Sequence, residues 1–282
     1  MLIHGLVPSK LKFLSSVCGE SMCSRYGRQG FRFLTSTSTR TNSNWDPTLS
    51  LQLNHPTLVL LEKCSSRVHF KQILAQIMRV NLIAATFPMS RLILFSAISY
   101  PQNLDLAVLL FNHFTPNPNL YIYNTMISAL WYSSSQSLAL YSSMLRSCVY
   151  PDKNTLVYLV KSSKCLVEVK QIHCHAVVTG LLLSLENNYL QNSLMKMYIE
   201  NGQMGLAHMV FLNMPEPDTA SYNVMIVGYA KKGCSLEAVK LFHQMVALGL
   251  EYDEFTILGL LVCCGKLGEL RLGKSVHGLM EK

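Results

Sequence analysis

The chain has 282 residues, half of them apolar, and its 24 Lys and Arg residues outnumber 16 Asp and Glu residues to give a net charge of +8. This length and apolar content allow one large domain, two small ones or an array of repeats. No stretch approaches the ~18 consecutive apolar residues of a membrane-spanning helix, so no membrane association is expected. The nine cysteines form no C-x-x-C pair, which argues against a zinc framework or a disulfide scaffold.

Most of the positive charge lies at the start of the chain. Residues 1–44 carry a net charge of +5 and include the hydroxyl-rich run RFLTSTSTRTNS. A basic, hydroxyl-rich segment that is poor in acidic residues is typical of an organelle transit peptide, and its arginines favour a mitochondrion over a chloroplast. A disordered basic tail is the alternative. The remaining net charge of +3 is too small to indicate a nucleic-acid partner on its own.

Two kinds of segment recur along the rest of the chain. YNTMISAL, which begins at Tyr123, returns as YNVMIVGYA from Tyr222, and a related QNSLMKMY begins at Gln191. The acidic residues that punctuate these copies are Asp152, Asp218 and Asp253. Segments that begin with KQ or KS start at Lys71, Lys170 and Lys274. Both kinds recur at a spacing of about 100 residues, which indicates an internal repeat array.

The unit from Thr219 to Asp253 shows what one repeat encodes. Apolar residues recur at helical spacing on both sides of a break at Lys232 and Gly233, and Gly249 is placed to end the second stripe. The pattern predicts a helix, a turn and a second helix. One such hairpin cannot bury its apolar face alone, so neighbouring units are expected to stack into an all-α fold, an α-solenoid.

The same unit, TASYNVMIVGYAKKGCSLEAVKLFHQMVALGLEYD, is 35 residues long and resembles a pentatricopeptide repeat. The unit that ends at Asp218 resembles the short variant of this repeat, and the segments with KQIH and KSVH resemble its long variant. The alternation resembles the PLS subfamily of plant organellar proteins and implies a right-handed α-solenoid. The implied units are a degenerate long unit at 45–85, short units at 86–119 and 188–218, standard units at 120–152 and 219–253, a long unit at 153–187 and a partial long unit at 254–282.

The resemblance implies binding of single-stranded RNA, with one base read per repeat by two side chains, the fifth residue of the first helix and the last residue of the unit. An amide offers a base edge both a donor and an acceptor, whereas a carboxylate only accepts. Carried onto this chain, the reading pairs are Ser90 with Asn119, Asn124 with Asp152, Asn192 with Asp218, and Asn223 with Asp253. By the family's pairing rules these pairs imply the footprint 5′-A-U-n-U-U-n, where n marks the long units. The alternative for each Asn is a helix-start residue that caps its own backbone.

Many members of the resembled subfamily continue into a deaminase-like domain for C-to-U RNA editing, which needs an H-x-E motif and a distant C-x-x-C to hold zinc. Neither motif occurs in the 282 residues, and the last unit is incomplete. The sequence therefore predicts a specificity factor that is not an enzyme, needs no cofactor and acts with editing-complex proteins. It also predicts a truncated product, a partial gene model or a short adaptor. A helical protein-binding scaffold and a non-functional truncated copy are the alternatives.

Two local patterns suggest other chemistry. GELRLGKS, from Gly268 to Ser275, matches the phosphate-binding pattern G-x-x-x-x-G-K-[ST], but the repeat places the preceding ILGLLVCC in a helix rather than in the strand that such a loop follows. A nucleotide site is therefore not expected.

The metal-like grouping is Cys165, His173, Cys174 and His175. Adjacent helical residues point about 100° apart and cannot all converge on one ion, so no metal is expected.

Overall fold

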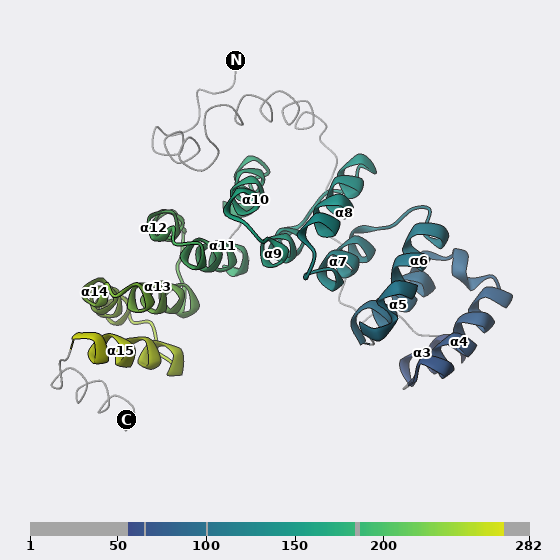
Figure 1. The fold of residues 1–282 in the computed structure, drawn as a ribbon, viewed down its shortest axis with the longest axis horizontal. Coiled ribbons are helices and arrows are strands. Elements are labelled where there is room, and N and C mark those ends of the chain that lie inside the picture. Colours follow the sequence, from purple (N-terminus) through teal and green to yellow (C-terminus); the bar gives the residue numbers. More distant parts are fainter. Residues whose placement is uncertain (1–55, 65, 100, 184–186, 268–282) are drawn as a thin grey trace, which may run out of the picture. The chain divides into compact units, whose positions relative to one another are not determined.

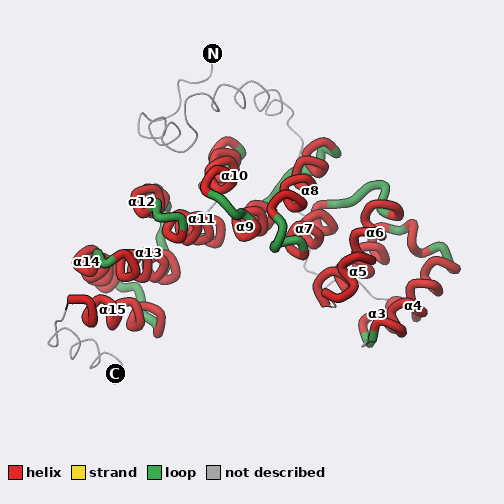
Figure 2. Tube along the Cα trace, in the orientation of Figure 1, coloured by secondary structure: helices red, strands yellow, loops and turns green. Residues whose placement is uncertain are grey.

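The computed structural model describes residues 56–267, apart from Ser65, Tyr100 and residues 184–186. In this part of the chain every regular element is a helix (Figure 2). The described residues divide into two compact units at the junction of Pro151 and Asp152. The predicted all-α class is confirmed for these residues.

The N-terminal unit is built from paired helices and short 3-10 or π segments. Its elements are α3 (Pro56–Glu62), α4 (Arg67–Arg79), η2 (Leu82–Ala84), α5 (Thr86–Leu94), η3 (Phe95–Ser99), η4 (Pro101–Asn103), α6 (Leu104–Phe114), α7 (Leu120–Ala129) and α8 (Ser134–Arg146). Helices α3 and α4 pack together, as do α5 with α6 and α7 with α8, while α5 also lies against α3 and α7. Apolar side chains from these helices form one core, in which Phe70, Leu92, Leu110 and Met126 are almost completely buried.

The C-terminal unit repeats the same arrangement with more regular helices. Its elements are α9 (Lys153–Ser162), α10 (Leu166–Val178), η5 (Leu181–Leu183), α11 (Tyr189–Glu200), α12 (Met204–Leu212), α13 (Thr219–Lys232), α14 (Ser235–Ala247) and α15 (Glu254–Leu267). Helices α9, α11, α13 and α15 contact one another in that order, and α10, α12 and α14 each pack on the helix before them (Figure 1). Helices α11 and α13 are therefore each covered on one side by their own second helix and on the others by the first helices of their neighbours.

The first helices of neighbouring pairs approach closely at Gly228. A Cβ atom at this position of α13 would lie 2.6 Å from Cδ1 of Ile199 on α11. Leu194, Met195, Met225 and Ile226 are completely buried around this contact. The row of first helices is thus held by close-packed apolar side chains, and it fixes the spacing of any polar group that the same helices carry.

Two of the second helices, α8 and α14, end in the same hydrogen-bond motif. After α14, Gly249 has φ +73°, its N–H donates to the carbonyl of Val246, and the next N–H donates to the carbonyl of Met245. This is a Schellman motif, for which glycine is the favoured residue because the left-handed conformation strains a side chain. The end of the second helix predicted at Gly249 is confirmed. After α8 the same two bonds form around Cys148, a residue with a side chain at φ +55°.

Six first helices begin at or next to a boundary of the implied units: α5, α7, α9, α13 and α15 begin at the first residue of a unit, and α11 begins one residue later. Helix α3 begins at Pro56, within the implied unit 45–85. The assignment of units to long, short and standard classes stays a prediction.

The transit-peptide prediction for residues 1–44 and the motif GELRLGKS lie outside the described residues. ILGLLVCC lies within α15, so it is helical as the repeat predicted. Among the described helices, none has the length and apolar character needed to cross a bilayer.

Candidate nucleic-acid interface

The last residues of four implied units cap the first helix of the next unit. In each case the Oδ1 atom accepts the backbone N–H three residues further on, at 2.7 to 3.0 Å. The capping residues are Asn119, Asp152, Asp218 and Asp253. Each satisfies a helix-start N–H that would otherwise lack a partner, which typically stabilises a protein by about 1 kcal/mol. These four residues therefore have a structural role, whatever they bind.

Asn223 lies on α13, and its amide meets the cap of α15. Its Nδ2 donates to both carboxylate oxygens of Asp253, at 2.8 and 2.9 Å, and its Oδ1 accepts from the hydroxyl of Thr256 at 2.6 Å. Asn223 is only 7% exposed, Thr256 is completely buried and Asp253 is exposed. The amide thus bonds to the last residue of its own unit and to Thr256 of the next unit, and it does not cap its own helix. The structure brings the predicted pair into contact and adds Thr256 as a third member.

The unit before it has the same arrangement with a serine. The hydroxyl of Ser221 lies 2.9 Å from Oδ1 of Asn192 on α11 and 2.7 Å from Oδ1 of Asp218, and it donates to these oxygens. The Ser221 hydroxyl therefore links the amide of Asn192 to the carboxylate of Asp218. Ser221 is completely buried, whereas Asn192 is partly exposed and Asp218 is exposed. Two successive units of the row α11, α13 and α15 therefore present an amide and a carboxylate joined by a buried hydroxyl.

The carboxylates of both units are stabilised in their charged form. Partial burial of Asp253 raises its pKa, but hydrogen bonds from the backbone N–H and hydroxyl of Thr256, from Asn223 and from the N–H of Phe255 outweigh this effect and hold the pKa below its ordinary value. The pKa of Asp218 is lowered for the same reason: hydrogen bonds from Ser221, Asn188 and Asn192 outweigh the opposing effect of burial. Both groups are therefore acceptors at neutral pH.

Further bonds fix the loops that carry these carboxylates. The hydroxyl of Thr219, the first residue of α13, donates to the carbonyl of Glu251 at 2.9 Å. One unit earlier, Nδ2 of Asn188 donates to the carbonyl of Glu216, also at 2.9 Å. Each acceptor lies two residues before the capping Asp, so the start of one unit anchors the segment that leads to its last residue. The carboxylate is consequently held from both sides.

The N-terminal unit places its predicted residues differently. Ser90 on α5 is 3% exposed, and its hydroxyl donates to the carbonyl of Phe87 in the same helix at 2.7 Å. Asn119 is exposed and caps α7 through the N–H of Ile122. Asn124 is partly exposed on α7. Its predicted partner Asp152 belongs to the C-terminal compact unit, which begins at that residue. The reading roles of Ser90, Asn119, Asn124 and Asp152 stay predictions.

The metal-like grouping on α10 is divided between the core and the surface. His173 is completely buried and lies 2.9 Å from the hydroxyl of Tyr198 through its Nδ1, and burial lowers its pKa to about 3. Cys174 is buried as well, whereas Cys165 is exposed. Within the described residues, no group of three or more His, Cys, Asp or Glu side chains is arranged to hold a metal ion. His173 is a packed core residue that hydrogen-bonds to a neighbouring helix.

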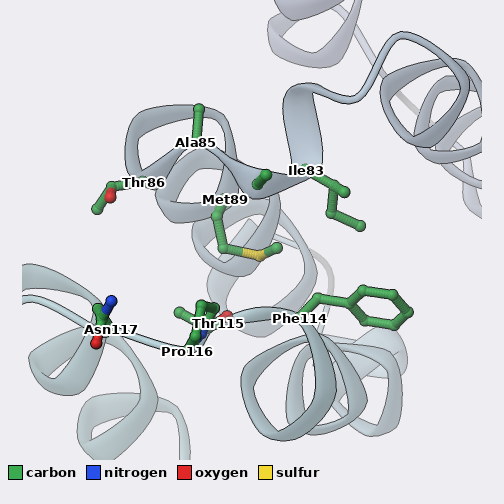
Figure 3. A pocket seen from close by; sticks show the side chains of 9 residues that line it. Ile83, Ala85, Thr86, Met89, Phe114, Thr115, Pro116 and Asn117 are labelled. Atoms are coloured by element: carbon green, nitrogen blue, oxygen red, sulfur yellow. The ribbon is translucent and has the colours of Figure 1, made fainter.

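A small pocket lies in the N-terminal unit between the start of α5 and the segment after α6 (Figure 3). Its volume is about 60 Å³, and its walls include Ile83, Met89, Phe114 and Pro116. Pockets that bind small molecules usually measure about 300–1,000 Å³, so this pocket is too small for such a ligand. A second, more open pocket of about 580 Å³, whose walls include Leu104 and Trp131, reaches that size. The predicted binding surface is the exposed edge of the first helices, where no enclosed cavity is required.

Sequence reasoning missed the hydroxyl residues beneath the pairs. A Ser or Thr follows each capping Asp at the third position, as Thr155, Ser221 and Thr256. This D-x-x-[ST] spacing is visible in the sequence and is related to a capping box, in which two residues at this separation satisfy each other's backbone N–H groups. The spacing alone predicts a cap. The contacts of Ser221 and Thr256 with the Asn of the preceding unit needed the structure.

Comparison with known proteins agrees with the repeat and the fold. Residues 217–266 match the PPR repeat family, and residues 192–216 match the PPR repeat. The chain is 61% identical over 255 residues to the mitochondrial pentatricopeptide repeat-containing protein At3g04750 of Arabidopsis thaliana. The alignment covers 90% of this chain and 38% of that protein. It is 33% identical over 245 residues to At2g22410, another mitochondrial pentatricopeptide repeat-containing protein of that plant. This alignment covers 85% of the present chain and 36% of At2g22410. The chain therefore spans little more than a third of these relatives.

Among solved structures, the fold is similar to that of the pentatricopeptide repeat protein PPR10 in complex with an 18-nt psaJ RNA element. The TM-score is 0.54 at 16% sequence identity, over 97% of this chain and 40% of that chain. The similarity confirms the predicted stacked-helix solenoid fold. The matched repeats, the 61% identity to one such protein and the shared architecture identify the chain as a pentatricopeptide repeat protein.

Proposed function

We propose that this chain binds single-stranded RNA in a sequence-selective way and reads uridine at two successive positions through Asn192 with Asp218 and Asn223 with Asp253. The observation that carries the proposal is a repeated link between the amide near the start of a unit and the carboxylate that ends the same unit. The link is direct between Asn223 and Asp253, and it runs through the Ser221 hydroxyl between Asn192 and Asp218. The two pairs lie one helix pair apart on the row α11, α13 and α15. A regular spacing of polar pairs suits a strand of regularly spaced bases.

The chemistry of each pair suits a base edge. One hydrogen of Asn223 Nδ2 can be shared by the two oxygens of Asp253, which leaves its second hydrogen as a donor. Oδ1 has two lone pairs, so it can accept a further hydrogen bond beside that from Thr256. The neighbouring carboxylate, which is charged at neutral pH, repels acceptor atoms and attracts donors. Uracil offers a donor at N3 between two carbonyl acceptors. A combination of donor and acceptors on the protein can therefore bind this edge.

The footprint 5′-A-U-n-U-U-n extends this proposal to the remaining units. Its fourth and fifth positions rest on the two linked pairs of the C-terminal unit. Its first position rests on Ser90 and Asn119, and its second on Asn124 and Asp152, through the repeat register alone. The structure of PPR10 with an RNA element supports the ligand class.

We also propose a mitochondrial location and a role in RNA processing. Two relatives with mitochondrial names and the Arg-containing, hydroxyl-rich residues 1–44 support the location. The alternation of unit lengths favours C-to-U editing as the event, in which this chain would supply sequence recognition. Because residues 1–282 contain no H-x-E motif, the catalytic group would come from outside them, in an editing-complex protein.

The proposal is tested by equilibrium titration of the full chain at one fixed salt concentration, because phosphate contacts make affinity depend on salt. Two labelled RNAs of equal length are compared by fluorescence anisotropy: one carries A-U-n-U-U-n and the other has the same bases in scrambled order. We expect at least about tenfold tighter binding to the first, a difference near 1.4 kcal/mol. Equal affinity for both RNAs, or none for either, would contradict the proposal and favour the helical protein-binding scaffold.

A further inference from the structure

We infer that Thr256 is a positioning residue that fixes the orientation of the Asn223 amide and thereby sets the preference for uridine over cytidine at one RNA position. Ser221 has the corresponding role for Asn192. The inference rests on the proposed function and adds a third residue to each reading pair, contributed by the following unit. Neither hydroxyl needs to touch RNA, because both are completely buried.

The hydrogen of the Thr256 hydroxyl has a defined direction. The backbone N–H of Asp253 donates to Thr256 Oγ1 at 3.1 Å, so this oxygen already acts as an acceptor. Its own hydrogen can point to Oδ1 of Asn223 at 2.6 Å or to Oδ1 of Asp253 at 3.1 Å. The shorter distance favours the amide. Oδ1 of Asn223 thus faces a buried donor.

The opposite side of the amide faces a group that only accepts. Nδ2 of Asn223 lies 2.8 and 2.9 Å from the two oxygens of Asp253. A rotation of the amide by 180° would bring Oδ1 against this carboxylate and Nδ2 against Thr256, which exchanges two attractive contacts for one repulsive and one weaker contact. Asp253 and Thr256 together therefore select one orientation of the amide. Without the hydroxyl, only the carboxylate opposes rotation, and Oδ1 loses its buried donor.

The orientation matters because uracil and cytosine differ by an exchange of donor and acceptor. Uracil presents an N–H at position 3 and a carbonyl at position 4, whereas cytosine presents a bare nitrogen at position 3 and an amino group at position 4. An amide that can adopt both orientations can satisfy either base. An amide held in one orientation can satisfy only one of these two edges. Loss of the Thr256 hydroxyl should therefore weaken discrimination more than overall binding.

Ser221 makes a second, independent set of the same kind of hydrogen bonds, to Asn192 and Asp218. Its hydroxyl is nearer to Asp218, at 2.7 Å, than to Oδ1 of Asn192, at 2.9 Å. The single hydrogen is therefore shared less favourably with the amide than in Thr256. We expect a smaller effect at the RNA position that Asn192 reads, which is the fourth position of the footprint.

The experiment measures the affinity of the full chain for three RNAs: A-U-n-U-U-n, the same RNA with cytidine at the fifth position, and the same RNA with cytidine at the fourth position. Thr256→Val removes the hydroxyl at nearly constant volume, and Thr256→Ser retains it as the matched control. Thr256→Val should reduce the uridine-to-cytidine affinity ratio at the fifth position by about three- to tenfold, the range expected for one lost hydrogen bond. The ratio at the fourth position and the behaviour of Thr256→Ser should stay as in the wild type.

The outcomes separate this inference from the proposed function. A wild type that prefers uridine, with an unchanged ratio in Thr256→Val or an equally reduced ratio in Thr256→Ser, would overturn the inference and leave the proposed function intact. A wild type without base preference would overturn both. If circular dichroism shows that Thr256→Val is unfolded, Ser221→Ala provides the test, and it should lower the ratio at the fourth position while sparing the fifth.

Discussion

Asp253 uses one carboxylate for two purposes. Its Oδ1 caps α15 through the N–H of Thr256, and both of its oxygens accept from the amide of Asn223. A single residue therefore joins the start of one first helix to the side chain of the preceding one. Any change at this position alters both the stability of the helix end and the surface proposed to read RNA.

The double use of Asp253 predicts a dependence of stability on pH. Its pKa in the folded protein is lowered, chiefly by hydrogen bonds that outweigh partial burial, so the stabilisation is fully present above the unfolded pKa of about 3.9. It is lost as the pH falls through the lower pKa of the folded state. Asp253→Asn, which cannot titrate, should be less stable than the wild type at pH 7, and the gap should narrow below about pH 4.

Urea unfolding of both proteins at pH 7 and pH 3.5, followed by far-UV circular dichroism, checks this prediction. The comparison of two proteins at each pH cancels the contributions of the other titrating groups. A gap that stays constant or widens at low pH would show that the ionised carboxylate is not what stabilises the contact.

At the scale of single residues, the pairs in the C-terminal unit could be predicted and their third member could not. Asn and Asp occur at equivalent positions of successive repeats in the sequence. These positions within the repeat are sufficient to pair Asn223 with Asp253. The role of Thr256 depends on the separation between α13 and α15, which packing determines. Conversely, Ser90 occupies the equivalent position of its repeat, but its hydroxyl donates to a backbone carbonyl of its own helix. Serine side chains within helices often hydrogen-bond to nearby backbone groups in this way.

At the scale of elements, the ends of the second helices reveal a strained position. Gly249 after α14 and Cys148 after α8 adopt the same left-handed conformation with the same two hydrogen bonds. Glycine adopts it without strain, whereas a residue with a Cβ atom is disfavoured by roughly 1 kcal/mol. Cys148 is exposed and its thiol forms no disulfide, so no packing contact is expected to compensate fully.

Replacing the strained residue should stabilise the protein. We expect Cys148→Gly to raise the free energy of unfolding by up to about 0.5 kcal/mol, since the added flexibility of the unfolded chain offsets part of the relieved strain. The reverse change at the matched position, Gly249→Ala, should lower it by about 1 kcal/mol. Urea titrations of the three proteins give the comparison. Stabilisation in both variants, or in neither, would refute the strain argument.

At the scale of the whole molecule, the repeat carried the prediction of fold. Helix, turn and helix were readable from the unit Thr219–Asp253 because both apolar stripes have helical spacing, and the structure has α13 and α14 there. The irregular middle of the N-terminal unit, with η3 and η4 between α5 and α6, was not readable. There the segment from Leu92 to Ile98 is apolar except for Ser96 and contains no Gly or Pro, so sequence alone could not place the end of the helix.

We propose that Asn223 and Asp253 together read one base, at the fifth position of the footprint. The most direct test is the variant Asn223→Thr, titrated beside the wild type with RNAs that carry U or G at that position. By the pairing rules of pentatricopeptide repeats, Thr with Asp favours guanosine. We predict that the wild type prefers uridine by about tenfold, or 1.4 kcal/mol, and that Asn223→Thr prefers guanosine. An unchanged preference in the variant would contradict the assignment of this pair.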